Sequence, residues 1–471
     1  GPWSCLGSCR AAHRSRPVVE LALAGFVALW LALGVRRPFL WVLAYLYVDI
    51  VAPQKISSIL AHAPLSLIVF VLAVVGFLFL DNKEKMRVSL RQGLMMALLA
   101  YCAMTTMTAD FPDAAAAKWG WVWKSLVFAI FLPFTLRTRL RIEAAATVMV
   151  LAASTIVIDG ALKTLGGGGG YGELKLLVND NTGLYEGSTL ACVAIAIVPL
   201  AFWLAGNGTV LPRGRWAQLF ALGLTGAGLL IPIGTEARTG LLCAGLLAVL
   251  LLRTVKRRGL YIGALVAAGM LAMPFLPSSF TDRMHTIENN KADQSASTRI
   301  AVWKWTLGYA ADHPLGGGFD SFRGNRLVIT TTDSQSSGGT TTMQSAQTVD
   351  QGRAFHSAYF EMLGEQGWPG LALWLTLQIS GIVQLEGVQR RLRRSPDPQD
   401  KRDAGLALAL QQGHFVYLLG ATFVGIAYQP FIYMLIGLQI ALVQQVARRR
   451  QGEDARTPAR PGMTAPRTGA A

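Results

Sequence analysis

The sequence is short of charged residues. Only 15% of its 471 residues are Asp, Glu, Lys or Arg, whereas soluble globular proteins carry roughly 25%. Hydrophobic residues make up 52%, and the mean hydropathy is +0.40. This shortage argues against an ordinary soluble enzyme and indicates a chain that lies largely within a membrane.

Cysteine is scarce as well, with 5 in the chain. Cys5 and Cys9 lie in an N-terminal stretch that lacks a starting Met and resembles a cloning remnant. We therefore expect residues 1–17 to be cloning-derived or disordered. The other cysteines lie in separate apolar runs, at Cys102, Cys192 and Cys243. Their separation predicts buried free thiols rather than a disulfide framework or a metal cluster.

Motifs for nucleotides and metals are also missing. The glycine-rich stretch 165–175 lacks the Gly-Lys-Ser/Thr ending of a phosphate-binding loop and is interpreted as a flexible turn. No Asp-x-Asp pair offers the metal clamp of nucleotide-sugar enzymes, and the 6 histidines lack a spacing such as His-Glu-x-x-His. We expect no metal and no cofactor, with a zinc site at His285, His313 and His356 as the weaker alternative.

The chain does contain a series of apolar runs, and crossing a bilayer takes about 20 such residues. They lie at 18–52, 62–80, 92–108, 119–136, 142–160, 186–206, 216–233, 239–252, 259–277, 360–387, 405–427 and 430–447. The series predicts an all-α polytopic membrane protein with about 12 transmembrane helices. Arg36 and Arg37 interrupt the run 18–52, which forms either two short spans or one span with a half-buried segment; we count one.

Lys and Arg gather in alternate loops. The basic segments are 81–91, 136–141, 212–215, 253–258, 389–402 and the tail 447–450. Because cytoplasmic loops are enriched in Lys and Arg, these segments are expected to face the cytoplasm. The net charge of +16 therefore reflects membrane orientation, and we expect no nucleic-acid partner.

This orientation divides the chain. The expected parts are N-terminal transmembrane helices at 18–277, a periplasmic loop domain with amphipathic helices at 278–357, C-terminal transmembrane helices at 358–447 and a disordered cytoplasmic tail at 448–471. Within the loop domain, 297–322 opens with a helix whose apolar face holds Ile300, Trp303 and Leu307. The Ser/Thr/Gly-rich segment 330–348 predicts a mobile loop.

A histidine stands where the loop domain returns to the membrane. The unperturbed pKa of histidine is about 6.5, so a neutral imidazole at His356 can accept a proton near pH 7. Glu361 would either orient this ring or offset a nearby cation. The alternative is an interfacial histidine that is only hydrogen-bonded to backbone.

Cations gather on the same side. Arg238 lies in a tight turn between two spans, Arg283 and Arg299 flank the base of the loop domain, and Lys118 and Lys124 lie at the outer end of another span. Such a ring suits a phosphate or pyrophosphate, since guanidinium groups match phosphate oxygens. The alternative for Arg238 is a side chain that reaches lipid phosphates.

Three stretches share a pattern with one known family. TEARTGLL (235–242) is similar to its Ser/Thr–Arg–Thr/Ala–Gly turn. STRIAVWKWTLGYAADHPLGGGFDSF (297–322) is similar to its Arg-x-x-x-Trp helix followed by His-Pro-x-Gly-x-Gly, and AFHSAYFEMLGEQGWPGL (354–371) to its His-Asn-x-x-Leu pattern with a later Gly. In their order and spacing these stretches resemble the bacterial O-antigen ligase family, which is related to O-antigen polymerases and protein O-oligosaccharyltransferases.

The resemblance implies a GT-C-like glycosyltransferase of the bacterial inner membrane whose active site faces the periplasm. Its reaction would transfer a polysaccharide from undecaprenyl pyrophosphate to a sugar hydroxyl of lipid A–core, with inversion and without metal. Membrane lipid, the lipid-linked donor and the lipid A–core acceptor would be its partners.

The resemblance also implies residue roles. His356 would be the general base, and Arg238 and Arg299 would bind the donor pyrophosphate. Further residues are added from location alone: Arg283 for the pyrophosphate, with Glu361 and Lys124 in support.

Two departures leave the acceptor open. Ser357 follows His356 where the family commonly has Asn, and the segments 48–58 and 176–200 look closer to ligase relatives described as O-glycosylation ligases. The alternatives are a protein O-oligosaccharyltransferase or an O-antigen polymerase that uses the same donor. A lipid-linked sugar transporter is the non-enzyme alternative, but no internal repeat of the kind that many transporters carry is visible.

Overall fold

A computed structural model describes residues 4–81, 87–168, 174, 176–178, 182–272, 294–337 and 340–456. The chain is 79% helical and forms an all-α polytopic membrane protein, as predicted. Its elements are α1 (Ser4–Arg36), α2 (Phe39–Val51), α3 (Pro53–Ile56), α4 (Ser58–Ala61), α5 (Leu65–Leu80), α6 (Leu90–Met107), α7 (Pro112–Thr135), α8 (Arg139–Leu165), η1 (Gly183–Tyr185), α9 (Gly187–Ala196), α10 (Val198–Asn207), α11 (Arg215–Gly234), α12 (Arg238–Leu251), α13 (Arg258–Ala272), α15 (Gln294–Asp312), η3 (Ser321–Gly324), β1 (Arg326–Ser337), β2 (Thr340–Gln351), α16 (Ala358–Leu392), α17 (Pro398–Ala421) and α18 (Pro430–Arg456).

In the described part of the chain, every apolar run predicted from the sequence overlaps a helix or a pair of helices. The end of the run 259–277, from residue 273 onward, lies outside the described residues. Within the described ranges, 7 helices are long and apolar enough to cross a membrane, and shorter apolar helices accompany them. The run 18–52 divides into α1 and α2 just before Pro38, whose ring cannot continue a helix. Val18–Arg36 is long enough to cross a membrane, and Phe39–Val51 is a shorter apolar helix. The helix α1 begins at Ser4, so much of the expected disordered N-terminus is helical.

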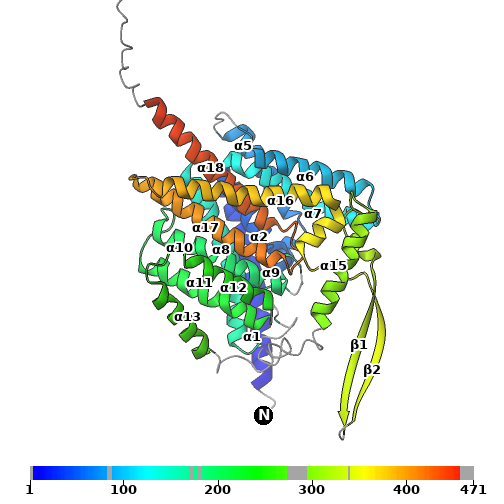
Figure 1. Ribbon diagram of the computed structural model, residues 1–471. Coiled ribbons are helices and arrows are strands. Elements are labelled where there is room, and N and C mark those ends of the chain that lie inside the picture. The colour runs from blue at the N-terminus through cyan, green and yellow to red at the C-terminus, as the bar shows by residue number, and fades with distance from the viewer. Residues whose placement is uncertain are drawn as a thin grey trace, which may run out of the picture.

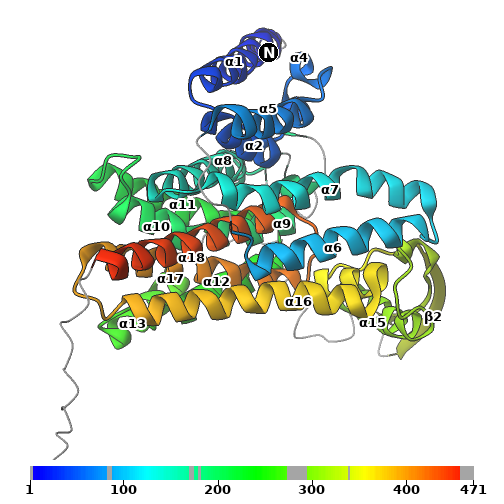
Figure 2. The same cartoon turned by 90° about the horizontal axis from the view of Figure 1, so that it is seen from above.

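The spans pack as a bundle with a buried centre. In Figure 2, α6, α7, α16 and α18 run side by side, with α15 and the hairpin at one end and the C-terminal end of α18 at the other. The helices α9 and α10 are the most enclosed, with 89% of their apolar window buried. The outer helix α1 exposes apolar side chains instead, as expected of a helix that faces lipid.

The helix α16 is broken near its start. Gly367 has a positive φ of 62° and interrupts the helical backbone. The loop after α15 packs into this break, where the amide of Trp368 donates to the carbonyl of Pro314 at 3.0 Å. A Cβ on Gly316 would lie 2.5 Å from the Glu365 carbonyl oxygen, and one on Gly367 would lie 2.2 Å from the Pro314 oxygen. This close approach of two backbones explains the first glycine of the His-Pro-x-Gly-x-Gly motif, Gly316, whereas the last, Gly318, lies against Ala109.

The loop domain differs from its prediction in two ways. The helix α15 exists, but Ile300 and Leu307, predicted on its apolar face, are 49% and 47% exposed. Its buried face is made by Val302, Thr306 and Ala310, and the helix packs against α16. The second difference is the predicted mobile loop 330–348, which lies within an antiparallel hairpin.

In this hairpin β1 pairs with β2 from Arg326 opposite Gln351 to Ser337 opposite Thr340. It extends away from the helices (Figure 1). Thr-rich runs favour β structure, and the Gly338-Gly339 pair between them is a hairpin signal in the sequence. The prediction of a mobile loop did not take these two signals into account.

Candidate active site

The segment that carries His356 is held in place by a buried amide. Asn325 is 0% exposed; its Nδ2 donates to the Arg353 carbonyl at 2.7 Å, and its Oδ1 accepts from the Arg353 amide at 2.9 Å. Just beyond this clamp, His356 adopts a left-handed backbone with φ of 49°. Such a conformation is uncommon outside glycine and is often found at functional sites.

The tryptophan of the Arg-x-x-x-Trp motif holds the same segment from the other side. Trp303 Nε1 donates to the Phe355 carbonyl at 2.9 Å. Its ring stacks on Phe360, with centroids 5.0 Å apart and planes 7° from parallel. The motif therefore fixes the position of His356, while Arg299, one turn earlier on α15, brings positive charge toward it.

His356 lies on the wall of a cavity of about 990 Å³. The lining comes from segments 48–55, 114–121, 182–189, 320–323, 354–365 and 424–430. Polar and charged side chains from five of these stretches face the same space as His356. A pocket with such convergent polar groups is the default location for a binding or catalytic site.

The surroundings of His356 favour its neutral form. The side chain is accessible to solvent, but burial against the cavity wall lowers its pKa below the usual 6.5, as do the charges of Arg299 and Arg353. The carboxylate of Glu186 acts in the opposite direction. A neutral imidazole is the form that can take a proton from a hydroxyl.

This pKa predicts a pH profile. A base acts when deprotonated, and the lowered pKa keeps His356 deprotonated to a lower pH. If His356 is the base of the glycan transfer expected from the sequence, the rate should rise with pH along a limb centred below pH 6.5. The rate should then no longer change with pH at pH 7. Initial rates between pH 5 and 8 would be measured, with the melting temperature followed at each pH as the control. A limb centred above pH 6.5 would contradict the conclusion that the surroundings of His356 lower its pKa.

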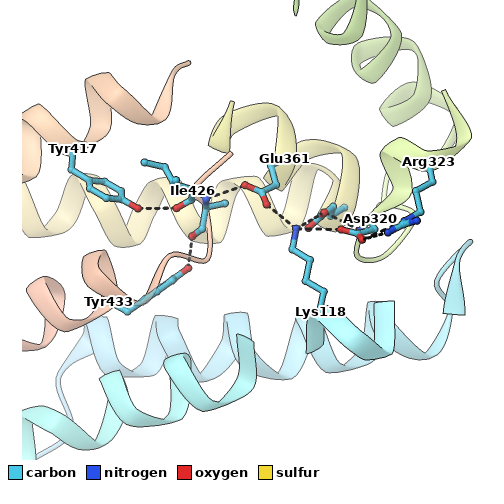
Figure 3. Close-up of polar contacts among 9 residues, drawn as sticks. Lys118, Asp320, Arg323, Glu361, Tyr417, Ile426 and Tyr433 are labelled. Atoms are coloured by element: carbon cyan, nitrogen blue, oxygen red, sulfur yellow. Dashed lines mark hydrogen bonds and ion pairs between the residues drawn. The ribbon is translucent and has the colours of Figure 1, made fainter. Parts of the chain in front are cut away.

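The residues of a buried ion cluster, drawn in Figure 3, are among those that line the cavity. Lys118 Nζ lies 2.7 Å from both Glu361 Oε1 and Glu365 Oε1, and 3.7 Å from Asp320 Oδ1. It also lies 5.0 Å from the centre of the Tyr428 ring. The cluster joins α7 to α16, to the turn before η3 and to the loop before α18.

Glu361 is part of this cluster, where its carboxylate offsets the charge of Lys118. Its role in catalysis stays a prediction. Its other oxygen accepts from the Ala427 amide at 3.0 Å. The expected supporting cation, Lys124, does not line the cavity; it lies beside Trp123 on α7, and its charge acts on Asp49.

The predicted pyrophosphate ligands are placed as follows. Arg238 begins α12, in a turn that packs on the start of α9: a Cβ on Gly187 would lie 3.0 Å from Thr235 Cγ2. Arg283 lies outside the described residues. Neither Arg238 nor Arg299 is among the described side chains that line the cavity. The cations that line it are Lys55, Lys118 and Arg323.

Comparison with known families fits this arrangement. Residues 222–375 match the O-antigen ligase family. This segment is an O-antigen ligase domain. The ligase domain contains the Arg238 turn, α15, the hairpin and His356, and members of its family are glycosyltransferase-like ligases that act on lipid-linked glycans in membranes.

The ligase domain is preceded by a second family match. Residues 18–209 match a family of unknown function (DUF5935). The chain matches no curated protein. Asp49, Lys55, Lys118 and Glu186 all lie in this N-terminal segment, so the cavity next to His356 is built by both segments together.

Proposed function

We propose that this protein transfers a glycan from undecaprenyl pyrophosphate to a sugar hydroxyl of lipid A–core, at the periplasmic face of the bacterial inner membrane. The observation that supports this most is His356, a residue of the O-antigen ligase domain that lies on the wall of a polar cavity and whose surroundings favour its neutral form. A hydroxyl acceptor gains from a base within hydrogen-bond reach, typically by about 10²–10⁴ in rate.

In the proposed reaction the imidazole of His356 takes the proton of the acceptor hydroxyl. The acceptor oxygen forms a bond to the anomeric carbon of the donor as the bond from that carbon to the pyrophosphate oxygen breaks, and the configuration inverts. The bonding electrons leave with the pyrophosphate. The growing negative charge is stabilised by the cations near His356, among them Arg299 and Arg353.

The proposed orientation places 278–357 in the periplasm and residues from 448 onward in the cytoplasm. It is supported by the separation of charge along the bundle, since the C-terminal end of α18 and the basic 389–402 segment lie at the end opposite α15 (Figure 2). Arg449 is paired there with Asp400, which belongs to α17. Cytoplasmic ends are the basic ends in membrane proteins.

The test is transfer by purified protein in detergent with undecaprenyl-pyrophosphate-linked glycan and excess EDTA. We expect transfer to lipid A–core at a rate within about twofold of the rate without EDTA, because side-chain cations rather than a metal stabilise the leaving group. Parallel reactions offer a periplasmic protein or a second lipid-linked glycan. Loss of transfer in EDTA that added Mg²⁺ restores would refute the metal-free mechanism, and glycan on another acceptor would reassign the enzyme to one of its relatives.

A further inference from the structure

Part of the cavity wall comes from the N-terminal segment of unknown function. The end of α2 contributes Asp49, α3 contributes Gln54, and the residue that precedes α9 is Glu186. None of these residues belongs to the motifs of the ligase domain. Yet Glu186 is close enough to His356 for its charge to act on the imidazole.

These side chains offer unused hydrogen-bond acceptors. Asp49 Oδ2 and Gln54 Oε1 are buried and have no hydrogen-bond partner among the described residues. The Glu186 carboxylate caps α9: Oε2 accepts from the Thr189 amide at 2.6 Å and from its hydroxyl at 2.7 Å, while Oε1 accepts only from the Ser188 amide at 3.1 Å. A carboxylate oxygen has two lone pairs, so Oε1 can accept one further bond.

This pattern selects the chemistry of the ligand. Phosphate oxygens are acceptors and carry negative charge, so they match neither the carboxylates nor the amide oxygen. A sugar carries several hydroxyl donors on one small ring and matches all three. A metal ion is a poorer match, because no group of three His, Cys, Asp or Glu side chains suited to a metal occurs in the described part of the chain.

The wall is also held in a fixed shape. Tyr185 hydroxyl donates to the Val51 carbonyl at 2.5 Å, which ties η1 to the end of α2. Lys55 Nζ donates to Thr182 Oγ1 at 2.7 Å, which ties α3 to the same turn. Groups fixed in this way bind a ligand without the cost of ordering them.

We propose that Asp49, Gln54 and Glu186 form the subsite for the acceptor sugar, and that the N-terminal segment 18–209 is therefore the acceptor-recognition part of the enzyme. The subsite holds the acceptor ring by its hydroxyls and presents one of them to His356. This inference rests on the proposed function, because it concerns the same cavity and the same transfer.

The experiment compares Asp49→Asn and Glu186→Gln with the wild type. Asp312→Asn, at the exposed end of α15, is the matched control for loss of a carboxylate. Binding of a core oligosaccharide freed from lipid A is measured by titration calorimetry in detergent without donor. KM values for acceptor and for donor are then measured in the transfer reaction. Glu186→Gln could also disturb α9, because Glu186 caps that helix. Asp49 caps no helix, so an effect of Asp49→Asn does not have this second explanation.

We expect each variant to weaken binding of the core oligosaccharide and to raise the acceptor KM by about tenfold, as loss of one hydrogen bond does. The donor KM and the control variant should stay within about twofold of the wild type. A raised donor KM with an unchanged acceptor KM would assign the wall to the donor, and unchanged binding in both variants would remove the subsite. Failure of the proposed function would show in the wild type itself, whereas failure of this inference shows only in the variants.

Discussion

Replacing His356 with asparagine is expected to lower the transfer rate by about 10²–10⁴-fold while leaving donor binding within about twofold of the wild type. Asparagine removes the base but tolerates a left-handed backbone better than alanine does, and His356 has φ of 49°. The loss therefore reports chemistry rather than backbone strain. It is measured as kcat with saturating acceptor, and donor affinity is measured separately by binding of the lipid-linked glycan.

The control for this variant is His313→Asn. His313 is exposed at the end of the loop domain helix and stacks on Tyr309, with ring centroids 4.4 Å apart. Its replacement should leave kcat unchanged. If His356→Asn retained more than about a tenth of the wild-type rate, His356 would be a structural residue of the membrane boundary and the base would have to be sought elsewhere.

Replacing Lys118 with methionine is expected to lower the free energy of unfolding by about 3–5 kcal/mol, because removing one partner of a buried ion cluster leaves the others uncompensated. Methionine keeps most of the volume of lysine. The carboxylates left behind are Glu361 and Glu365, which are 7% and 0% exposed. The loss would appear as a lower melting temperature of the purified protein in detergent.

Two comparisons make the Lys118 result specific. Lys163→Met removes a partly exposed lysine that pairs with Asp159 one turn away, and such pairs contribute less than about 1 kcal/mol. Adding Glu361→Gln and Glu365→Gln to Lys118→Met should recover much of the lost stability, since amides cost less to bury than carboxylates. Equal losses for Lys118→Met and Lys163→Met would mean that water, not protein, solvates the cluster.

Part of this site could be predicted from local sequence. The turn at Arg238, the helix with Arg299 and Trp303, and the segment with His356 each form a continuous stretch with its own pattern. Trp303 contacts the His356 segment, whereas Arg238 and Arg299 are not among the described side chains that line the cavity. The patterns could not predict which residue each of these side chains contacts in the folded protein. The sequence places Trp303 on the apolar face of a helix, but its indole nitrogen donates to the Phe355 carbonyl beside His356.

Residues from different helices were harder to predict. Lys118 and Lys124 look alike in the sequence, but a helix has about 3.6 residues per turn, so they point to different faces of α7. Only the tertiary structure, which places the start of α16 next to Lys118, decides which of the two lysines meets the carboxylates of α16. Glu186 carried no usable signal, because glutamate is not among the residues preferred at helix N-caps, although it caps α9 in the structure.

The prediction of which face of α15 is buried was wrong for a related reason. In a helix beside a membrane, apolar residues face lipid as well as protein, so the most apolar stripe does not identify the packed side. Ile300 and Leu307 are exposed, whereas the smaller Ala310 lies against the rest of the protein. Small residues allow close approach of helices, and they were the better guide here.

The break at Gly367 separates the reaction chemistry from the bilayer. The short helix that follows His356 is held at its start by Asn325 and Trp303 and at its end by the Pro314 loop, whereas the remainder of α16 continues as a span that packs against α6 and α17. Membrane helices adjust to bilayers of different thickness by tilting. Tilt of residues 368–392 would be taken up at the glycine joint, so the distance between base and substrate does not follow the thickness of the surrounding lipid.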